Sequence, residues 1–288
     1  MNHWPVTDFS IYEVGPRDGL QSRDTITPTR KKVELIEKIA DVGIENIEVG
    51  AMVSHNKVPN MADSAVVFDR VSYLQSHCEL GVLVPNKRGV ELAREIGATK
   101  FNIFFSPSEY FNMNNLGRNT HSAIAHYCDA LEGIRKKDVR VYLSTAFGCP
   151  ITGDIPERDM KTALDYADTL GSSIVLCDTI GNANPTLIHE VVSMASETDA
   201  NLALHLHHGL RKGKMTDNLS AAFDCGIDQF DSSIGGLGGC PFIPGSGGNL
   251  ATEQLVAWGE KENLDCGVSL RDLRPLVNYV DKSIKIGL

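Results

Sequence analysis

Short apolar runs alternate along the chain with longer segments whose apolar residues recur every three or four positions. A run of four to six apolar residues is typical of a β-strand, whereas the longer spacing is typical of an amphipathic helix. Some runs, such as Ile174-Val175-Leu176, are continuously apolar, as expected for parallel strands that are covered on both faces. Eight strands are predicted in this way: Phe9–Val14, Asn46–Val49, Leu80–Val84, Lys100–Phe104, Arg140–Ser144, Ser173–Cys177, Leu202–Leu206 and Gln229–Ser232.

The segments between these strands predict helices. The first has Pro28 in its first turn, places Val33, Ile36 and Ala40 on one face, and is followed by Gly43. The other helices are predicted at about 62–76, 87–97, 121–137, 157–170, 185–197, 215–225, 249–261 and 270–283.

Eight strand–helix units indicate the α/β class and, within it, a (β/α)8 TIM barrel. The length of 288 residues suits such a barrel, whereas a doubly wound sheet more often stops at about five or six strands. No Pro-, Gly- or Ser-rich linker divides the chain. We therefore expect one catalytic domain over residues 1–288, with an extra helix at its C-terminal end.

Composition and charge exclude several classes of protein. The chain carries 37 acidic and 27 basic residues without a basic block, which argues against a nucleic-acid partner. It lacks an apolar run long enough to span a membrane, and its start does not resemble a signal or transit peptide, so we expect a cytoplasmic protein. The seven cysteines contain no CxxC pair, which favours reduced thiols over disulfides or a zinc knuckle.

Polar residues follow several predicted strands, at the end of a barrel where chemistry is usually found. Arg17 and Asp18 come in a Gly-flanked turn after the first strand, and Glu48 stands between apolar neighbours in the second. Asp178 and Thr179 end the sixth strand. These residues are candidates for catalysis. The alternatives are a turn with a salt bridge for Arg17 and Asp18, a solvated side chain or a buried structural ion pair for Glu48, and a capping or turn role for Asp178.

The seventh strand contains two histidines in alternation. Because side chains at positions i and i+2 of a strand point to the same face, His205 and His207 point the same way. Two imidazoles provide half of a metal site, and Asp18 would add a harder ligand, although a single H-x-H motif also occurs by chance. Such a mixed set without cysteine favours Mg²⁺ or Mn²⁺ over a closed structural Zn²⁺ site.

The segment after the eighth strand holds seven glycines between residues 235 and 249. It has neither the Lys-Ser/Thr ending of a phosphate loop nor the GxGxxG spacing of a dinucleotide fold, so ATP and NAD are not indicated. Cys240 is either a small buried residue or an exposed, reactive thiol in this loop. Asn249 is either a helix cap or an oxygen ligand for a metal.

Together these motifs resemble hydroxymethylglutaryl-CoA lyase over nearly the whole chain. The Arg-Asp-Gly turn and the H-x-H strand are common to a wider superfamily of metal-dependent TIM-barrel lyases and condensing enzymes. The Gly-Leu-Gly-Gly-Cys-Pro loop is more specific for the lyases. The resemblance rests on five segments: Glu13–Gln21, Ile47-Glu48, Asp178–Gly181, His205–His207 and Gly236–Pro241 with Gly248–Glu253.

The resemblance implies a divalent cation, Mg²⁺ or Mn²⁺, held by Asp18, His205, His207 and Asn249. It implies cleavage of a 3-hydroxy-3-methylglutaryl thioester to acetyl-CoA and acetoacetate, a place in leucine degradation, an acyl-CoA substrate and a homodimer. Catalytic roles are then expected for Arg17, Asp18, Glu48, His205 and Cys240. Substrate-binding roles are expected for Arg17, Gln21, Asp178, Thr179, Arg211 and Lys212.

The chain departs from the family pattern after its second metal histidine. The family has Asp and a short Thr-x-Gly stretch there, whereas this chain has a longer and more basic loop, His208–Lys214. The acyl group of the substrate is therefore left open. The alternatives are a condensing acyltransferase of the same superfamily that joins acetyl-CoA to a keto acid, and a non-catalytic barrel that binds a metal or acyl-CoA.

Overall fold

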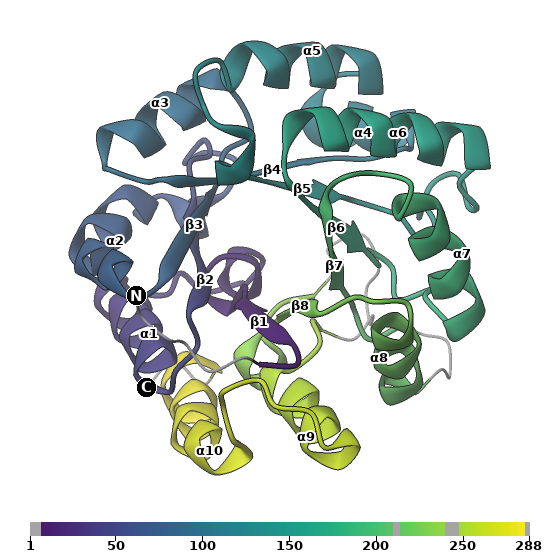
Figure 1. The fold of residues 1–288 in the computed structure, drawn as a ribbon. Coiled ribbons are helices and arrows are strands. Elements are labelled where there is room, and N and C mark those ends of the chain that lie inside the picture. The colour runs from purple at the N-terminus through teal and green to yellow at the C-terminus, as the bar shows by residue number, and fades with distance from the viewer. Residues whose placement is uncertain (1–6, 210–213, 240–247, 286–288) are drawn as a thin grey trace.

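The computed structural model describes residues 7–209, 214–239 and 248–285. Its centre is a closed barrel of eight parallel strands in the order β1 to β8, surrounded by helices (Figure 1). The predicted (β/α)8 barrel is therefore confirmed. The strands are β1 Ser10–Glu13, β2 Asn46–Ala51, β3 Glu79–Leu83, β4 Lys100–Phe105, β5 Val139–Leu143, β6 Ser173–Cys177, β7 Asn201–His205 and β8 Gln229–Ser232.

Closure of the barrel depends on the first and last strands. All four residues of β1 pair with β8, from Ser10 opposite Gln229 to Glu13 opposite Ser232. The register of β2 against β3 shifts between Glu48 and Gly50, and such a bulge redirects the side chains beside it.

The helices occupy most of the predicted segments. They are α1 Thr29–Asp41, α2 Ser64–Val71, α3 Lys87–Glu95, α4 Glu109–Leu116, α5 Thr120–Ala130, α6 Glu157–Leu170, α7 Pro185–Ala195, α8 Met215–Asp224, α9 Thr252–Glu262 and α10 Leu270–Tyr279. The expected extra C-terminal helix is α10, which follows α9 on the outside of the barrel (Figure 1). Within the described part of the chain, no helix combines the length and apolarity needed to cross a bilayer.

Two helix predictions were wrong in their bounds, and one helix was not predicted. The helix expected at 121–137 ends at Ala130, because Gly133 adopts a φ of 77° that a right-handed helix excludes. The helix expected from 249 begins at Thr252. Helix α4 was not predicted, since its buried residues include the polar Asn112, whose amide donates to the Ser106 carbonyl oxygen at 2.7 Å.

Most of the apolar core lies between the strands and the helices. Phe9, Phe230 and Trp258 form an aromatic cluster there, with ring centroids 5.5 to 6.0 Å apart. Burial of large aromatic rings is among the strongest contributions to packing, so this cluster fixes α9 against β1 and β8.

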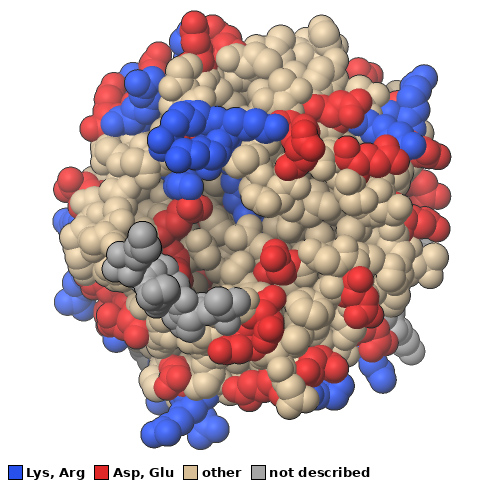
Figure 2. Space-filling view, in the orientation of Figure 1, with Lys and Arg blue, Asp and Glu red and all other residues tan. Residues whose placement is uncertain are grey.

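The N-terminal ends of the strands surround a hollow of about 320 Å³. In Figure 1 the strands follow one another clockwise. Because strand–helix–strand crossovers are right-handed, a clockwise order means that the N-terminal ends of the strands face the viewer. In Figure 2, Lys and Arg gather on one side of the central hollow, while Asp and Glu border other parts of it. Lys100 and Arg140 line this hollow, together with the acidic Glu79 and Asp138.

Candidate metal centre

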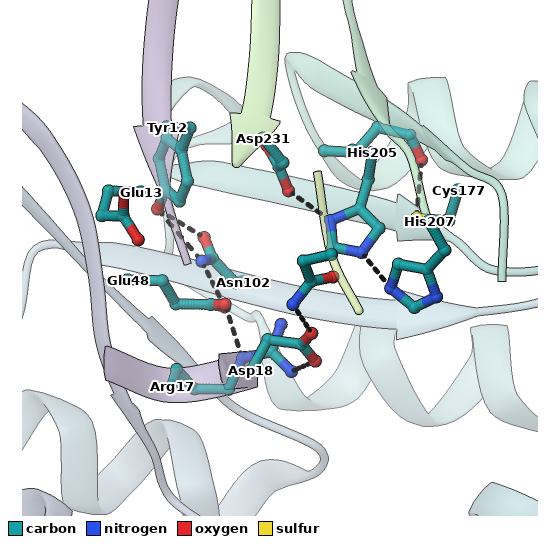
Figure 3. Close-up of polar contacts among 12 residues, drawn as sticks. Tyr12, Glu13, Arg17, Asp18, Glu48, Asn102, Cys177, His205, His207 and Asp231 are labelled. Atoms are coloured by element: carbon teal, nitrogen blue, oxygen red, sulfur yellow. Dashed lines mark hydrogen bonds and ion pairs between the residues drawn. The ribbon is translucent and has the colours of Figure 1, made fainter. Parts of the chain in front are cut away.

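Three predicted ligands come together at the C-terminal end of the barrel (Figure 3). Asp18 lies in a π-helical turn, Gly15–Gly19, that directly follows β1, while His205 ends β7 and His207 lies two residues later. One ligand atom from each of these residues lies within 4.8 Å of the others. Both imidazoles are buried, with exposed fractions of 7% and 9%, so they face the cluster and not the solvent.

The second nitrogen of each ring faces a hydrogen-bond acceptor. His205 Nδ1 lies 3.1 Å from Asp231 Oδ2, and His207 Nδ1 lies 3.3 Å from the carbonyl oxygen of Thr179. An acceptor at Nδ1 favours the tautomer with the proton on Nδ1, which leaves the Nε2 lone pair for a metal. The two Nε2 atoms lie only 3.0 Å apart, so both lone pairs point to the same place.

Asn249 completes the predicted set. Its Nδ2 donates to Asp18 Oδ2 at 2.8 Å and to the Leu237 carbonyl oxygen at 2.9 Å. Its Oδ1 is buried and accepts no hydrogen bond from the described residues. Asn249 forms a β-bridge with His207 three residues before α9, and the residue at the cap position of that helix is Ala251. The helix-cap interpretation of Asn249 is therefore wrong.

A second group of contacts holds Arg17 beside the cluster. Arg17 Nε donates to Glu48 Oε2 at 2.5 Å, and its Nη1 donates to Asp18 Oδ1 at 2.8 Å. Glu48 is fully buried and also accepts from Asn102 Nδ2 at 2.8 Å. The guanidinium thus has a fixed orientation, because two of its nitrogens are bound to carboxylates that are themselves held in place.

Charges around the cluster determine its protonation state. Burial opposes ionisation of Asp18, but the Arg17 guanidinium and the two imidazoles lower its pKa to about 2. Burial, reinforced by the neighbouring His205, lowers the pKa of His207 to about 4. At neutral pH, Asp18 is therefore an anion and His207 a neutral imidazole, which are the forms that bind metals.

These residues fit a divalent cation. The lone pairs of two imidazoles, an ionised carboxylate and an amide oxygen without a hydrogen-bond donor converge at one place. The ion-paired network around them contains three carboxylates and two guanidinium groups, which leaves one negative charge when both imidazoles are neutral. Its members are Asp18, Glu48, Asp231, Arg17 and Arg140. A cation that compensates this charge would be bound more tightly than by an electrically balanced site.

The predicted substrate-binding residues have different surroundings. Both carboxylate oxygens of Asp178 accept from backbone N–H groups of its own loop, from Asn182 at 2.7 Å and Ala183 at 3.1 Å, as the turn alternative predicted, whereas the cap of α7 is Asn184. Thr179 orients His207 through its carbonyl oxygen, while its hydroxyl accepts from the Thr145 N–H at 2.8 Å.

Gln21 has a buried Oε1 that accepts no hydrogen bond from the described residues, and its carbonyl oxygen accepts from Asn60 Nδ2 at 3.2 Å. Cys240, Arg211 and Lys212 lie outside the described residues.

Four residues of the barrel interior were missed by sequence reasoning. Asp231 holds His205, and Asn102 holds Glu48. Tyr12 and Arg140 lie one layer further from the cluster. A signal was available, because each of these polar residues interrupts a predicted apolar strand at a position that faces the barrel interior.

Comparisons with known proteins agree with this geometry. Residues 8–280 match the family model described as HMGL-like. The chain is 34% identical over 280 residues to the hydroxymethylglutaryl-CoA lyase YngG of Bacillus subtilis (strain 168), covering 96% of this chain and 93% of the relative. It is also 34% identical over 279 residues to a mitochondrial hydroxymethylglutaryl-CoA lyase of Macaca fascicularis, covering 95% and 85% of the two chains.

Two solved structures have the same fold at similar identity. The HMG-CoA lyase of Bacillus subtilis superposes with a TM-score of 0.90 at 33% identity, over 96% of this chain and 94% of that one. The HMG-CoA lyase of Acinetobacter baumannii, in complex with coenzyme A and 3-methylmalate, superposes with a TM-score of 0.87 at 33% identity. That match covers 94% of this chain and 90% of the other.

Proposed function

The chain belongs to the HMGL-like family, and from that premise we propose that it cleaves 3-hydroxy-3-methylglutaryl-CoA to acetyl-CoA and acetoacetate. The observation that carries this proposal is the position of Arg17. Its guanidinium is ion-paired to Asp18, which lies in the same cluster as His205 and His207. A metal centre and an oriented cation therefore lie side by side at one end of the barrel.

We assign the cation site to Asp18, His205, His207 and Asn249, with Mg²⁺ or Mn²⁺ as the ion. A bound divalent cation would supply Lewis acidity and would orient the hydroxyl and carboxylate oxygens of a substrate. The mixed nitrogen and oxygen donors support this choice of metals over a closed structural zinc site.

The reaction removes the proton of the tertiary hydroxyl and breaks the bond between C2 and C3 of the acyl chain. The electron pair of that bond becomes the enolate of acetyl-CoA, while C3 becomes the ketone carbon of acetoacetate. Asp18 is the ionised carboxylate of the ligand cluster, and we assign it the proton.

Arg17 is assigned to the thioester oxygen, where negative charge develops. Its Nε and Nη1 are bound to Glu48 and Asp18, and no described residue accepts a hydrogen bond from its Nη2. The N–H groups of Nη2 thus remain for the substrate. Donors that are already oriented toward a developing charge stabilise the transition state without reorganising, and the role of Glu48 is to maintain this orientation.

Cys240 is assigned to deliver a proton to the enolate carbon, on the strength of its Gly-Leu-Gly-Gly-Cys-Pro segment. The thiol form is required for this step, and the thiolate that remains regains, through solvent, the proton that Asp18 took from the hydroxyl, which returns both groups to their starting forms.

The test is a panel of thioesters with the purified protein and Mg²⁺ or Mn²⁺. Release of acetyl-CoA from 3-hydroxy-3-methylglutaryl-CoA is expected, and close 3-hydroxy-3-alkylglutaryl analogues show how the His208–Lys214 loop affects the choice of acyl group. Formation of a hydroxy acid from acetyl-CoA and a keto acid, without cleavage of any thioester, would instead assign a condensing enzyme.

Two further assignments come from the resemblance and from the relatives. We propose a homodimer, which analytical ultracentrifugation tests directly. We also propose a cytoplasmic location. Relatives named as mitochondrial and as cytoplasmic both match the chain, so fractionation of the source cells decides between these compartments.

A further inference from the structure

We propose that Arg140, a residue of β5 in the barrel interior, is a positioning residue that holds both halves of the active site in place. It makes no contact with the three clustered ligand residues, and it rests one layer nearer to the N-terminal end of the barrel. This inference builds on the proposed function, because the two halves are the metal centre and the guanidinium of Arg17.

The first connection leads from Arg140 to the metal histidines. Arg140 Nη2 donates to Asp231 Oδ1 at 2.6 Å, and Asp231 Oδ2 lies 3.1 Å from His205 Nδ1 (Figure 3). Asp231 is fully buried, so without a cation beside it the carboxylate would become protonated or would turn away. In either case His205 loses the acceptor that fixes its tautomer and its orientation.

The second connection leads from Arg140 to Arg17. The Arg140 guanidinium stacks on the Tyr12 ring, with Cζ 4.2 Å from the ring centroid. Tyr12 Oη accepts from Asn102 Nδ2 at 3.1 Å, and the same amide donates to Glu48 at 2.8 Å. Glu48 in turn holds Arg17, so three side chains link the two arginines.

Arg140 is itself fixed in three directions. Its Nη1 donates to Ser173 Oγ at 3.1 Å, at the start of the neighbouring β6, and to Gln229 Oε1, at the start of β8 across the barrel. The side chain is 7% exposed and is bounded on its outer side by the N-terminal hollow. A planar guanidinium makes the ion pair with Asp231, the hydrogen bonds that Nη1 donates to β6 and β8, and the stack on Tyr12 at once, which a lysine ammonium does not.

The decisive variants are Arg140→Lys and Arg140→Gln, with Arg135→Gln as the matched control. Arg135 lies five residues earlier, and its exposed side chain pairs with Asp138 on the surface. Mn²⁺ affinity is measured by titration calorimetry. The values of kcat and KM are measured with the thioester that the wild-type protein cleaves. The tautomer of His205 is read from the ¹⁵N NMR spectrum of its imidazole in metal-free protein.

Both Arg140 variants are expected to bind Mn²⁺ about 10- to 100-fold more weakly, to lower kcat and to populate the second tautomer of His205, with Lys less affected than Gln. Tyr12→Phe keeps the ring but removes the hydroxyl, so it should lower kcat while Mn²⁺ affinity stays unchanged. Arg135→Gln should match the wild type in every measurement.

A folded Arg140→Gln protein with wild-type Mn²⁺ affinity and a wild-type His205 tautomer would overturn the proposal. If neither Arg140 variant folds, Asp231→Asn breaks the same ion pair from its other side, and unchanged Mn²⁺ affinity in that variant would overturn it equally. Failure of the wild-type protein to cleave any thioester would refute the proposed function alone, since the metal and NMR measurements do not depend on turnover.

Discussion

His205 Nε2 and His207 Nε2 lie 3.0 Å apart, which is hydrogen-bond distance, while the other nitrogen of each ring faces an acceptor. When both imidazoles are neutral and carry their proton on Nδ1, the two Nε2 lone pairs face each other, and either a metal ion or a proton on His205 Nε2 removes their repulsion. A metal ion and a proton therefore compete for these two nitrogens, and this relation underlies the first prediction.

Removal of one ligand should abolish both metal binding and turnover. We expect His205→Ala or Asp18→Asn to weaken Mn²⁺ binding at least about 100-fold and to eliminate most acetyl-CoA release, because each deletes a donor atom. Calorimetry measures the Mn²⁺ affinity of each variant, and a chelator titration of the wild-type enzyme shows whether acetyl-CoA release requires the metal. His189→Ala, at an exposed position on α7, serves as the control, and full activity in excess chelator would contradict the prediction.

Cys240→Ser should separate catalysis from metal binding. We expect kcat to fall by about 100-fold or more, the usual scale for loss of a general acid, while the unfolding temperature and the Mn²⁺ affinity stay the same. Cys128→Ser, which changes an exposed cysteine of α5, provides the control. A nearly normal rate in the Cys240 variant would show that this thiol only fills space.

Neutralising the basic loop after β7 should affect substrate binding alone. With Arg211, Lys212 and Lys214 replaced by Gln, we expect KM for the thioester to rise and Mn²⁺ affinity to stay constant. The rise should shrink at high salt, because exposed charges are screened over about 10 Å at 0.1 M ionic strength. An unchanged KM for every cleaved thioester would mean that these charges do not take part in substrate binding.

Glu13 should make the protein less stable as the pH rises. Burial raises its pKa from 4.5 to about 7, even though its carboxylate accepts from the Ile234 N–H and the Thr252 hydroxyl. Between these two pH values the folded state binds more protons than the unfolded state, so the free energy of unfolding falls as the pH increases. The shift in the pKa of Glu13 corresponds to at most about 3 kcal/mol of the free energy of unfolding, and this contribution is lost completely above pH 7.

Glu13→Gln removes this titration while preserving the shape of the side chain. The stability of the variant relative to the wild type should therefore increase from pH 4.5 to pH 7 and then level off. Urea unfolding at a series of pH values measures the difference, and a constant difference over this range would exclude the shift.

The fold was predictable because parallel strands covered on both faces leave a clear apolar signal. Segments such as Ile174-Val175-Leu176 are completely buried, and all eight predicted strands form. Helix α4 left no such signal, since Asn112 on its buried side is stabilised by the Ser106 backbone and not by apolar packing. Local periodicity cannot reveal a helix whose buried face depends on hydrogen bonds to another segment.

The candidate site was predictable only for residues in compact motifs. The alternation of His205 and His207 defines their common direction, and the structure brings Asp18 to them. Asp231 and Arg140 stand alone in their strands, and their pairing depends on a contact between residues 91 positions apart. The sequence shows that a buried charge needs a partner, but which partner it finds is determined by the closure of the barrel.

The contact between Glu13 and Thr252 has a consequence for the synthesis of the protein. These residues are 239 positions apart, and they join the first strand to the helix that follows the last strand. A nascent chain on the ribosome cannot form this contact, or align Asp18 with Asn249, until almost the whole polypeptide has emerged. The metal centre is thus a late product of translation, and a prematurely terminated chain that lacks the segment after β8 would leave the buried carboxylate of Glu13 exposed to the quality-control machinery of the cell.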